Sequence, residues 1–108
     1  MKEKLYTQFD PVFFEKTRLS MLTILFSEGT VSFNRFKKLL GGTDGAIYSH
    51  IQKLVKSGYI KQKKSIFKEK PQTEYTLTEL GEETFKRYIS FLESILKEHG
   101  EGESNERK

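Results

Sequence analysis

The residues most able to do chemistry are lysines and short polar side chains that gather in one stretch of the chain. Residues 43–72 contain seven lysines against two acidic residues, whereas the net charge of the whole 108-residue chain is only +4. A local excess of positive charge is typical of a surface that faces a polyanion such as nucleic acid. The alternative interpretation is that these lysines only keep the surface soluble.

Part of this stretch has the pattern of a helix that could lie in the major groove of DNA. The predicted helix over residues 43–57 has an apolar stripe that faces the core, made of Ile47, Ile51, Leu54 and Val55. On its polar faces, the residues expected to contact base edges are Thr43, Tyr48, Ser49 and Gln52. Lys53 and Lys56 are expected to contact phosphates. Tyr48 could instead be a packing residue, and His50 a structural or phosphate-bonded histidine.

Thr43, Asp44 and Gly45 start this helix and are expected at its DNA-facing end, because free N–H groups at a helix start can hold a phosphate. A glycine in the first turn costs ~1 kcal/mol relative to alanine, so something should compensate. Close approach of DNA, or of the preceding helix, would need a residue without a side chain there. The other possibility is that the three residues are still a turn and the helix begins later.

The residues after this helix have the pattern of a β-hairpin with a basic tip. Residues 59–67 mix β-formers with lysines, Lys68-Glu69 begins a polar tip, Lys70-Pro71-Gln72 predicts a turn, and residues 73–77 alternate with period two. We expect four lysines to reach the adjacent backbone or the minor groove: Lys63, Lys64, Lys68 and Lys70.

Three further helices are predicted to position this hairpin and helix. Asp10 and Pro11 suit the start of a helix over residues 11–28, Ser32 can cap a second helix before Gly41-Gly42, and Thr78 can cap a last helix ending near His99. The fold class is therefore mainly α with a small β-hairpin, in the order helix, helix, helix, hairpin, helix. We expect one domain over residues 9–98, an N-terminal arm over 1–8 and a disordered tail over 99–108.

At this point the chain resembles the winged helix-turn-helix regulators of the arsenical-repressor and multiple-antibiotic-resistance type. The resemblance covers about residues 9–96 and rests on the ordered set Asp10-Pro11, Thr17-Arg18-Leu19, Ile24-Leu25, Thr43-Asp44-Gly45, Ser49-His50-Ile51, Lys53-Leu54, Gly58-Tyr59-Ile60, Lys70-Pro71, Thr73, Tyr75, Leu77-Thr78 and Gly81. It implies a stand-alone regulator that binds double-stranded DNA sequence-specifically. The absence of cysteine removes the thiolate metal sensing that many arsenical-repressor relatives use.

The outer helices carry more apolar residues than one small core can cover, which predicts a homodimer. The helix over residues 79–98 is the expected dimerisation element. The predicted interface consists of Phe9, Val12, Phe13, Tyr88, Ile89, Leu92, Ile95 and Leu96. A two-fold axis there would set two reading helices about one DNA turn apart, ~34 Å, for a palindromic site. The alternative is that the last helix folds back over its own domain.

Other function classes find little support in the sequence. No glycine-rich phosphate loop or Ser-His-acid set is present, and neighbours such as Ser49 and His50 point in different directions on a helix, so we expect no enzyme. We also expect no cofactor, no metal, no membrane span and a cytoplasmic location. The operator and any small-molecule effector are unknown. The serious rival is a winged-helix protein-interaction module without specific DNA binding.

Overall fold

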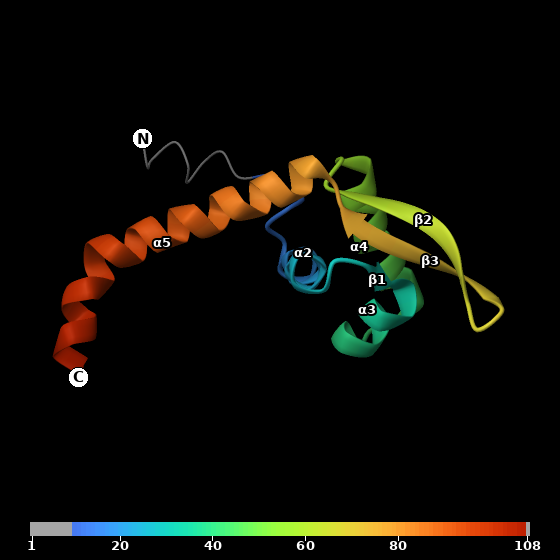
Figure 1. The fold of residues 1–108 in the computed structure, drawn as a ribbon, viewed down its shortest axis with the longest axis horizontal. Coiled ribbons are helices and arrows are strands. Elements are labelled where there is room, and N and C mark those ends of the chain that lie inside the picture. Colours follow the sequence, from blue (N-terminus) through green and yellow to red (C-terminus); the bar gives the residue numbers. More distant parts are fainter. Residues whose placement is uncertain (1–9, 108) are drawn as a thin grey trace.

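The computed structural model describes the backbone of residues 10–107 and the side chains of residues 10–99. The predicted arm over residues 1–8 and the predicted interface residue Phe9 lie outside the described residues. Figure 1 shows the elements in order: α2 (Lys16–Glu28), β1 (Val31–Ser32), α3 (Phe33–Leu40), α4 (Asp44–Lys56), β2 (Ile60–Phe67), β3 (Lys70–Leu77) and α5 (Glu79–Arg107). The predicted order of three helices, a hairpin and a last helix is confirmed.

The chain enters the domain through one capped turn rather than through a helix. The Asp10 carboxylate accepts the Val12 N–H at 2.9 Å, which caps the turn. The Val12 carbonyl accepts a hydrogen bond from Arg18 Nε at 2.6 Å, a side-chain donor in place of the N–H group that a helix would supply. Glu15 is extended and caps α2, accepting the Arg18 N–H at 2.9 Å. The prediction of a helix over residues 11–28 is therefore wrong for residues 11–15.

Side-chain caps fix the starts of α3 and α4, as the sequence predicted. The Ser32 hydroxyl accepts the Arg35 N–H at 3.1 Å, and the Thr43 hydroxyl accepts the Ala46 N–H at 3.1 Å. Gly41 ends α3 with a φ of 74°, a backbone conformation that residues with a Cβ rarely adopt. The short turn between these caps joins α3 to α4 as a helix-turn-helix pair.

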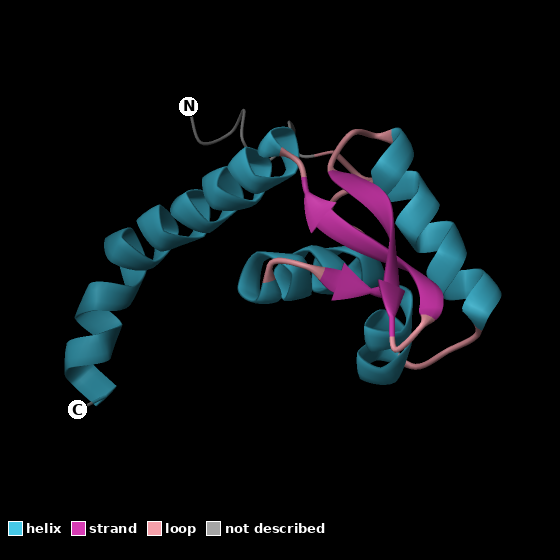
Figure 2. Cartoon of the chain, turned by 45° about the vertical axis from the view of Figure 1, so that its right-hand side comes forward, coloured by secondary structure: helices cyan, strands magenta, loops and turns pink. Residues whose placement is uncertain are grey.

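A three-stranded antiparallel sheet in the order β1-β3-β2 stands beside α4 (Figure 2). Val31 pairs with Tyr75 and Ser32 with Glu74, which makes β1 a short strand at the edge of the sheet. The hairpin turn lies at Lys68 and Glu69, which have φ values of 52° and 66°. The predicted turn at residues 70–72 is wrong, because those residues pair with β2 as the start of β3.

α5 is anchored tightly at its start. Thr78 donates its hydroxyl to the Gly58 carbonyl and accepts the Gly81 N–H at 3.0 Å, which confirms the predicted cap. A Cβ at Gly81 would lie 2.1 Å from the Tyr59 carbonyl oxygen, so only glycine allows this approach. The Tyr59 hydroxyl in turn donates to Asp10 at 2.9 Å, and burial together with this bond raises the pKa of Tyr59 to about 12.

The core lies between α2, α3, α4 and the sheet. Its fully buried side chains are Phe13, Met21, Leu22, Leu25, Val31, Phe36, Ile51, Leu54 and Ile60. Leu39 of α3 points outward and is 44% exposed. Both views show that α5 leaves this domain after its first turns and extends away from it (Figures 1 and 2). The helix continues to Arg107, beyond the end predicted near His99.

Candidate nucleic-acid interface

The rotation of α4 about its axis is fixed by its apolar stripe. Ile47, Ile51 and Leu54 are almost fully buried against the core, and Val55 packs against the same cluster. Because the helical period is 3.6 residues, the opposite face must then carry Gly45, Ser49 and Gln52, followed by Lys53 and Lys56 near the end of the helix.

Gly45 lies within the first turn of α4, at the centre of its outer face. The helix begins at Asp44, so the possibility that residues 43–45 are still a turn is not realised. A Cβ built on Gly45 meets no heavy atom within 4 Å, so contact with the preceding helix does not explain the glycine. The approach of DNA at this position stays a prediction.

Asp44 has a partner within the domain. Its carboxylate forms an ion pair with the Lys37 ammonium group of α3, across the turn between the two helices. Both side chains are well exposed, so this pair adds little to stability. It does place Asp44 at the edge of the outer face, toward α3, whereas the sequence treated it as a member of the DNA-facing group.

Tyr48 and Gln52 connect α4 to the hairpin. Gln52 Nε2 donates to Gln62 Oε1 of β2 at 3.3 Å. Tyr48 is 55% exposed, which argues against the alternative that it is a packing residue. A shallow hollow runs beside it between the helix and the sheet, lined by Tyr48, Gln62, Lys63, Lys64, Thr73 and Tyr75. The helix and the hairpin therefore offer one continuous polar surface.

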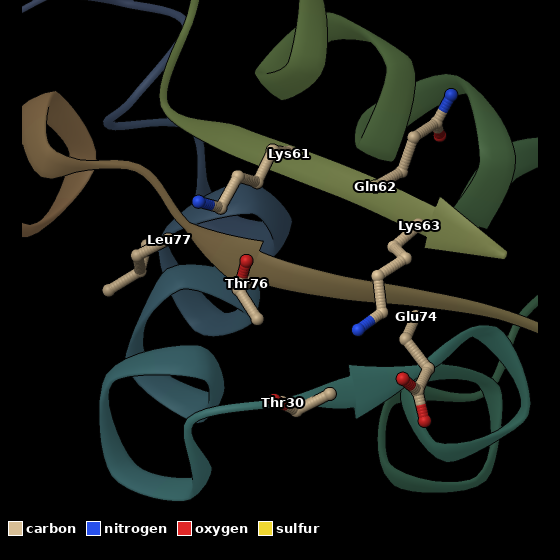
Figure 3. Close-up of a pocket in the computed structure, with 7 residues that line it drawn as sticks. All are labelled: Thr30, Lys61, Gln62, Lys63, Glu74, Thr76 and Leu77. Carbon is tan, nitrogen blue, oxygen red and sulfur yellow. The ribbon is translucent and has the colours of Figure 1, made fainter. Parts of the chain in front are cut away.

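The hairpin lysines divide between the two faces of the sheet. Lys64 pairs with Thr73, two positions from the pair Gln62 and Tyr75, so these residues share the face toward α4. Lys63 pairs with Glu74 and takes the opposite face with Lys61, around the hollow in Figure 3. The figure shows the Gln62 side chain pointing away from this hollow, toward α4. The four lysines predicted as one group are therefore not brought together.

Lys68 and Lys70 sit at the hairpin tip. Lys68 is in the turn, and its ammonium nitrogen lies 5.3 Å from the centre of the Phe67 ring. Lys70 is the first residue of β3 and pairs with Phe67. Both lysines are exposed, so they can reach a phosphate backbone that passes the tip.

Behind α4 lies a charged cluster that the sequence reasoning missed. The buried Arg18 donates from Nη1 to His50 Nδ1 at 2.9 Å, and Glu15 Oε1 lies 3.6 Å from the same ring nitrogen. Burial would raise the pKa of Glu15, but the Arg18 and Thr17 N–H groups and the neighbouring positive charges lower it below its usual value. These contacts favour the structural role for His50 over the phosphate-bonded alternative. The available signal was a charged residue, Arg18, inside an apolar helix pattern.

The predicted dimer residues fall into two groups. Phe13 is fully buried in the core of the single chain, so its prediction as an interface residue is wrong. Val12 is half-buried against the same core, and the Tyr88 ring rests on Phe14 with centroids 4.5 Å apart. The remaining four residues lie along the outer part of α5: Ile89 and Leu92 are each 38% exposed, Leu96 is 65% exposed and Ile95 is half-buried.

Two other kinds of site are absent from the part of the chain that the structure describes. No group of three or more histidine, cysteine, aspartate or glutamate side chains there is arranged to hold a metal ion. None of the described helices is both long and apolar enough to cross a membrane.

Comparison with known sequences agrees with this geometry. A profile of the winged helix DNA-binding domain matches residues 17–96. An uncharacterized protein of Methanocaldococcus jannaschii is 33% identical over 78 residues, which are 72% of this chain and 85% of that protein. Residues 17–96, which the profile matches, include α3, α4, the hairpin and most of α5.

Solved structures share the fold. A transcriptional regulator homologue from Pyrococcus horikoshii superposes with a TM-score of 0.76 at 28% identity, covering 90% of this chain and 96% of that one. A transcriptional regulator of the MarR family from Enterococcus faecalis superposes with a TM-score of 0.66 at 23% identity, covering 94% of each chain. Bacillus subtilis PadR, solved with operator DNA, gives 0.56 at 22% identity, covering 65% of this chain and 44% of that one.

Proposed function

This chain belongs to the winged helix DNA-binding domain family, and from that premise we propose that it is a homodimeric regulator of transcription that binds double-stranded DNA sequence-specifically. The family consists of DNA-binding domains, and the chain is accordingly not an enzyme. In the proposal α4 lies in the major groove and the β2–β3 hairpin contacts the adjacent backbone or minor groove. A regulator acts where the genome is, so the cytoplasmic location predicted from the sequence is part of the proposal.

The observation that carries the proposal is the outer face of α4. It combines a bare glycine, a hydroxyl, an amide and two lysines on a helix whose other side is locked into the core. A major groove about 12 Å wide admits such a helix, and Ser49 and Gln52 can then pair with base edges. Thr43 and Tyr48 flank them, with Lys53 and Lys56 positioned for phosphates.

The hairpin supports the same orientation. Lys64 shares the sheet face of Gln62, whose side chain is hydrogen-bonded to Gln52, so a duplex held on α4 passes close to Lys64. Lys68 and Lys70 extend this contact to the tip. Lys63 faces the other side of the sheet and is the weakest of the proposed hairpin contacts.

Dimerisation is proposed through the outer part of α5. Ile89, Leu92 and Leu96 follow one another at helical spacing and expose apolar surface where α5 has left the domain. Tyr88, Ile95 and Val12 border them. Pairing two copies about a two-fold axis would bury this stripe and present two α4 helices to one palindromic site.

The reading role of α4 is tested by comparing Gln52→Ala with the double variant Lys68→Gln, Lys70→Gln. Sequencing the genomic DNA that wild type retains at moderate salt defines its preferred site. Loss of a bidentate base contact by Gln52→Ala should cost about 1–3 kcal/mol at that site while binding to random DNA hardly changes. The lysine variant should weaken binding to both DNAs alike. Equal losses on both DNAs in both variants would contradict the assignment.

The assembly is tested by light scattering at micromolar concentration. Wild type should have twice the chain mass of 12.6 kDa, and the double variant Leu92→Asp, Ile95→Asp should be a monomer with much weaker site binding. A wild-type monomer with full affinity for its site would rule out the dimer.

The rival function, a protein-interaction module, is tested by measuring the affinity for random duplex DNA over a range of salt. An affinity that does not change with salt would favour that module.

A further inference from the structure

The tip of the hairpin carries two large apolar side chains that the fold leaves uncovered. Ile66 is 77% exposed and Phe67 is 57% exposed, next to the turn at Lys68 and Glu69. The hairpin projects beyond the body of the domain, away from α5 (Figure 1). An uncovered apolar pair at the end of a hairpin invites aggregation, so its presence calls for a partner.

The backbone of the tip is strained. Both turn residues, Lys68 and Glu69, adopt positive φ, where glycine or asparagine is usual in a two-residue hairpin turn. A left-handed conformation costs roughly 1–2 kcal/mol for a residue with a side chain. Strain of this kind concentrates at functional sites. Here it makes the turn as short as possible and holds Ile66 and Phe67 at the very end of the hairpin.

The surroundings of this pair indicate which partner it fits. The register puts Ile66 on one face of the hairpin with Lys64 and Pro71, and Phe67 on the other face with Lys70, so the tip is apolar and basic on both sides; Lys68 and Glu69 form the turn between them. The partner must therefore present negative charge on its rims and an apolar interior between them. Duplex DNA has this arrangement in its minor groove, where two phosphate rows border the edges of stacked bases about 6 Å apart.

We propose that Ile66 and Phe67 form an apolar wedge that enters the minor groove of the bound duplex and partly unstacks one base step, while Lys68 and Lys70 bind the flanking phosphates. The inference rests on the DNA binding proposed above. An inserted apolar side chain kinks the duplex, and the energy of the kink depends on the step that is opened. Pyrimidine–purine steps such as TpA open most easily. The wedge therefore gives the hairpin a sequence preference that lysines alone cannot supply.

The test uses two probes of identical composition, each about three helical turns long: alternating d(TA) and homopolymeric dA·dT. Wild type, Phe67→Ala, Phe67→Leu and Ile66→Ala are titrated by fluorescence anisotropy over a range of salt. Wild type should bind the alternating duplex more tightly. Phe67→Ala should weaken that binding about tenfold, the size expected for an aromatic ring that loses part of its burial.

The salt dependence separates the wedge from the lysines. Removing an apolar contact releases no counterion, so Phe67→Ala should keep the wild-type slope of log affinity against log salt, whereas Lys68→Gln should flatten it. Energy transfer between dyes on the two duplex ends should report a bend with wild type and Phe67→Leu, but a smaller one with Phe67→Ala and Ile66→Ala. Unchanged thermal melting of the free variants should show that the fold is intact.

Three results would overturn the inference. The first is equal affinity and equal bending for wild type, Phe67→Ala and Ile66→Ala. The second is a preference for alternating d(TA) that survives both substitutions. The third is a loss of dimer mass in light scattering of Phe67→Ala, which would mean that the tip contacts a second copy. A wild-type protein that binds neither duplex would instead contradict the proposed function itself.

Discussion

α4 and α5 are both one-sided helices, but only α4 has its apolar side covered by the rest of the protomer. Ile47, Ile51 and Leu54 of α4 are at most 3% exposed. On α5, Phe85 is buried near the start, whereas Leu96 farther along is 65% exposed. The apolar side of α4 is therefore buried within one chain, whereas the outer part of α5 is the surface that we propose a second copy covers.

The difference between the two helices separates the two kinds of contact that we propose. The uncovered face of α4 is polar and basic, as expected for a surface that meets charged DNA. The uncovered face of α5 is apolar, as expected for a surface that meets another protein. A substitution in one helix should therefore change a different property from a substitution in the other.

The largest effect should come from cutting back a buried side chain of α4. Leu54→Ala should lower the free energy of unfolding by about 2–5 kcal/mol, because it leaves a cavity in a fully packed core. Leu96→Ala on α5 is the matched control. It should lower stability by an amount that changes with protein concentration, since it weakens the proposed dimer. Urea unfolding at several concentrations measures both. Equal, concentration-independent losses would remove the distinction between the helices.

The anchor of α5 should be the next most sensitive point. Gly81→Ala brings a methyl group into the Tyr59 carbonyl oxygen, and overpacking of this kind costs typically about 1–3 kcal/mol. The expected result is a lower melting temperature together with weaker DNA binding, because α5 shifts against the domain. Gly100→Ala, a glycine farther along the same helix, serves as the control and should not destabilise the protein. If Gly81→Ala melted at the wild-type temperature, the close packing of α5 on Tyr59 would be refuted.

Gly45→Ala should change stability and binding in opposite directions. Alanine gains about 1 kcal/mol over glycine within a helix, and the new Cβ meets open space in the free protein. The variant should therefore melt at a higher temperature yet bind DNA less tightly, because its methyl group occupies the place of the DNA. A more stable variant with unchanged affinity would show that nothing approaches α4 at this point.

The effect that is absent at neutral pH is a pH dependence of stability at Tyr59. Because the pKa of Tyr59 is raised to about 12, from an ordinary value of about 10, its neutral form is favoured in the folded state. The resulting stability is fully present below about pH 10 and is lost as the pH rises toward 12. Urea midpoints compared across this window should fall more steeply for wild type than for Tyr59→Phe. Parallel declines would contradict a buried, hydrogen-bonded phenol.

Patterns local in sequence predicted most of the fold. The capping bonds at Ser32, Thr43 and Thr78 each come from the N–H group three positions later, and all three occur as expected. The apolar stripe of α4 likewise predicted its own burial. The start of the first helix was missed because Arg18 captures the Val12 carbonyl, a bond that involves a long side chain and has no local signature.

The candidate site was less predictable, because it depends on sheet register and on distant partners. Which face a hairpin lysine occupies changes with a shift of one residue, so Lys63 and Lys64 could not be separated before the pairing with Glu74 and Thr73 was known. The same holds for the turn, which moved from residues 70–72 to Lys68 and Glu69. Phe13 looked surplus in the sequence, yet it closes the core beside Tyr59, with ring centroids 5.0 Å apart.

The most direct test of the central claim, that α4 and the hairpin contact DNA, is a salt titration of binding to random duplex DNA. The wild-type plot of log affinity against log salt should be steep, and Lys53→Gln or Lys64→Gln should each reduce its slope by about 0.9, the value of one phosphate contact. Lys97→Gln, an equal loss of charge on the exposed surface of α5, should leave the slope unchanged. A flat wild-type plot, or equal reductions by all three substitutions, would contradict the account.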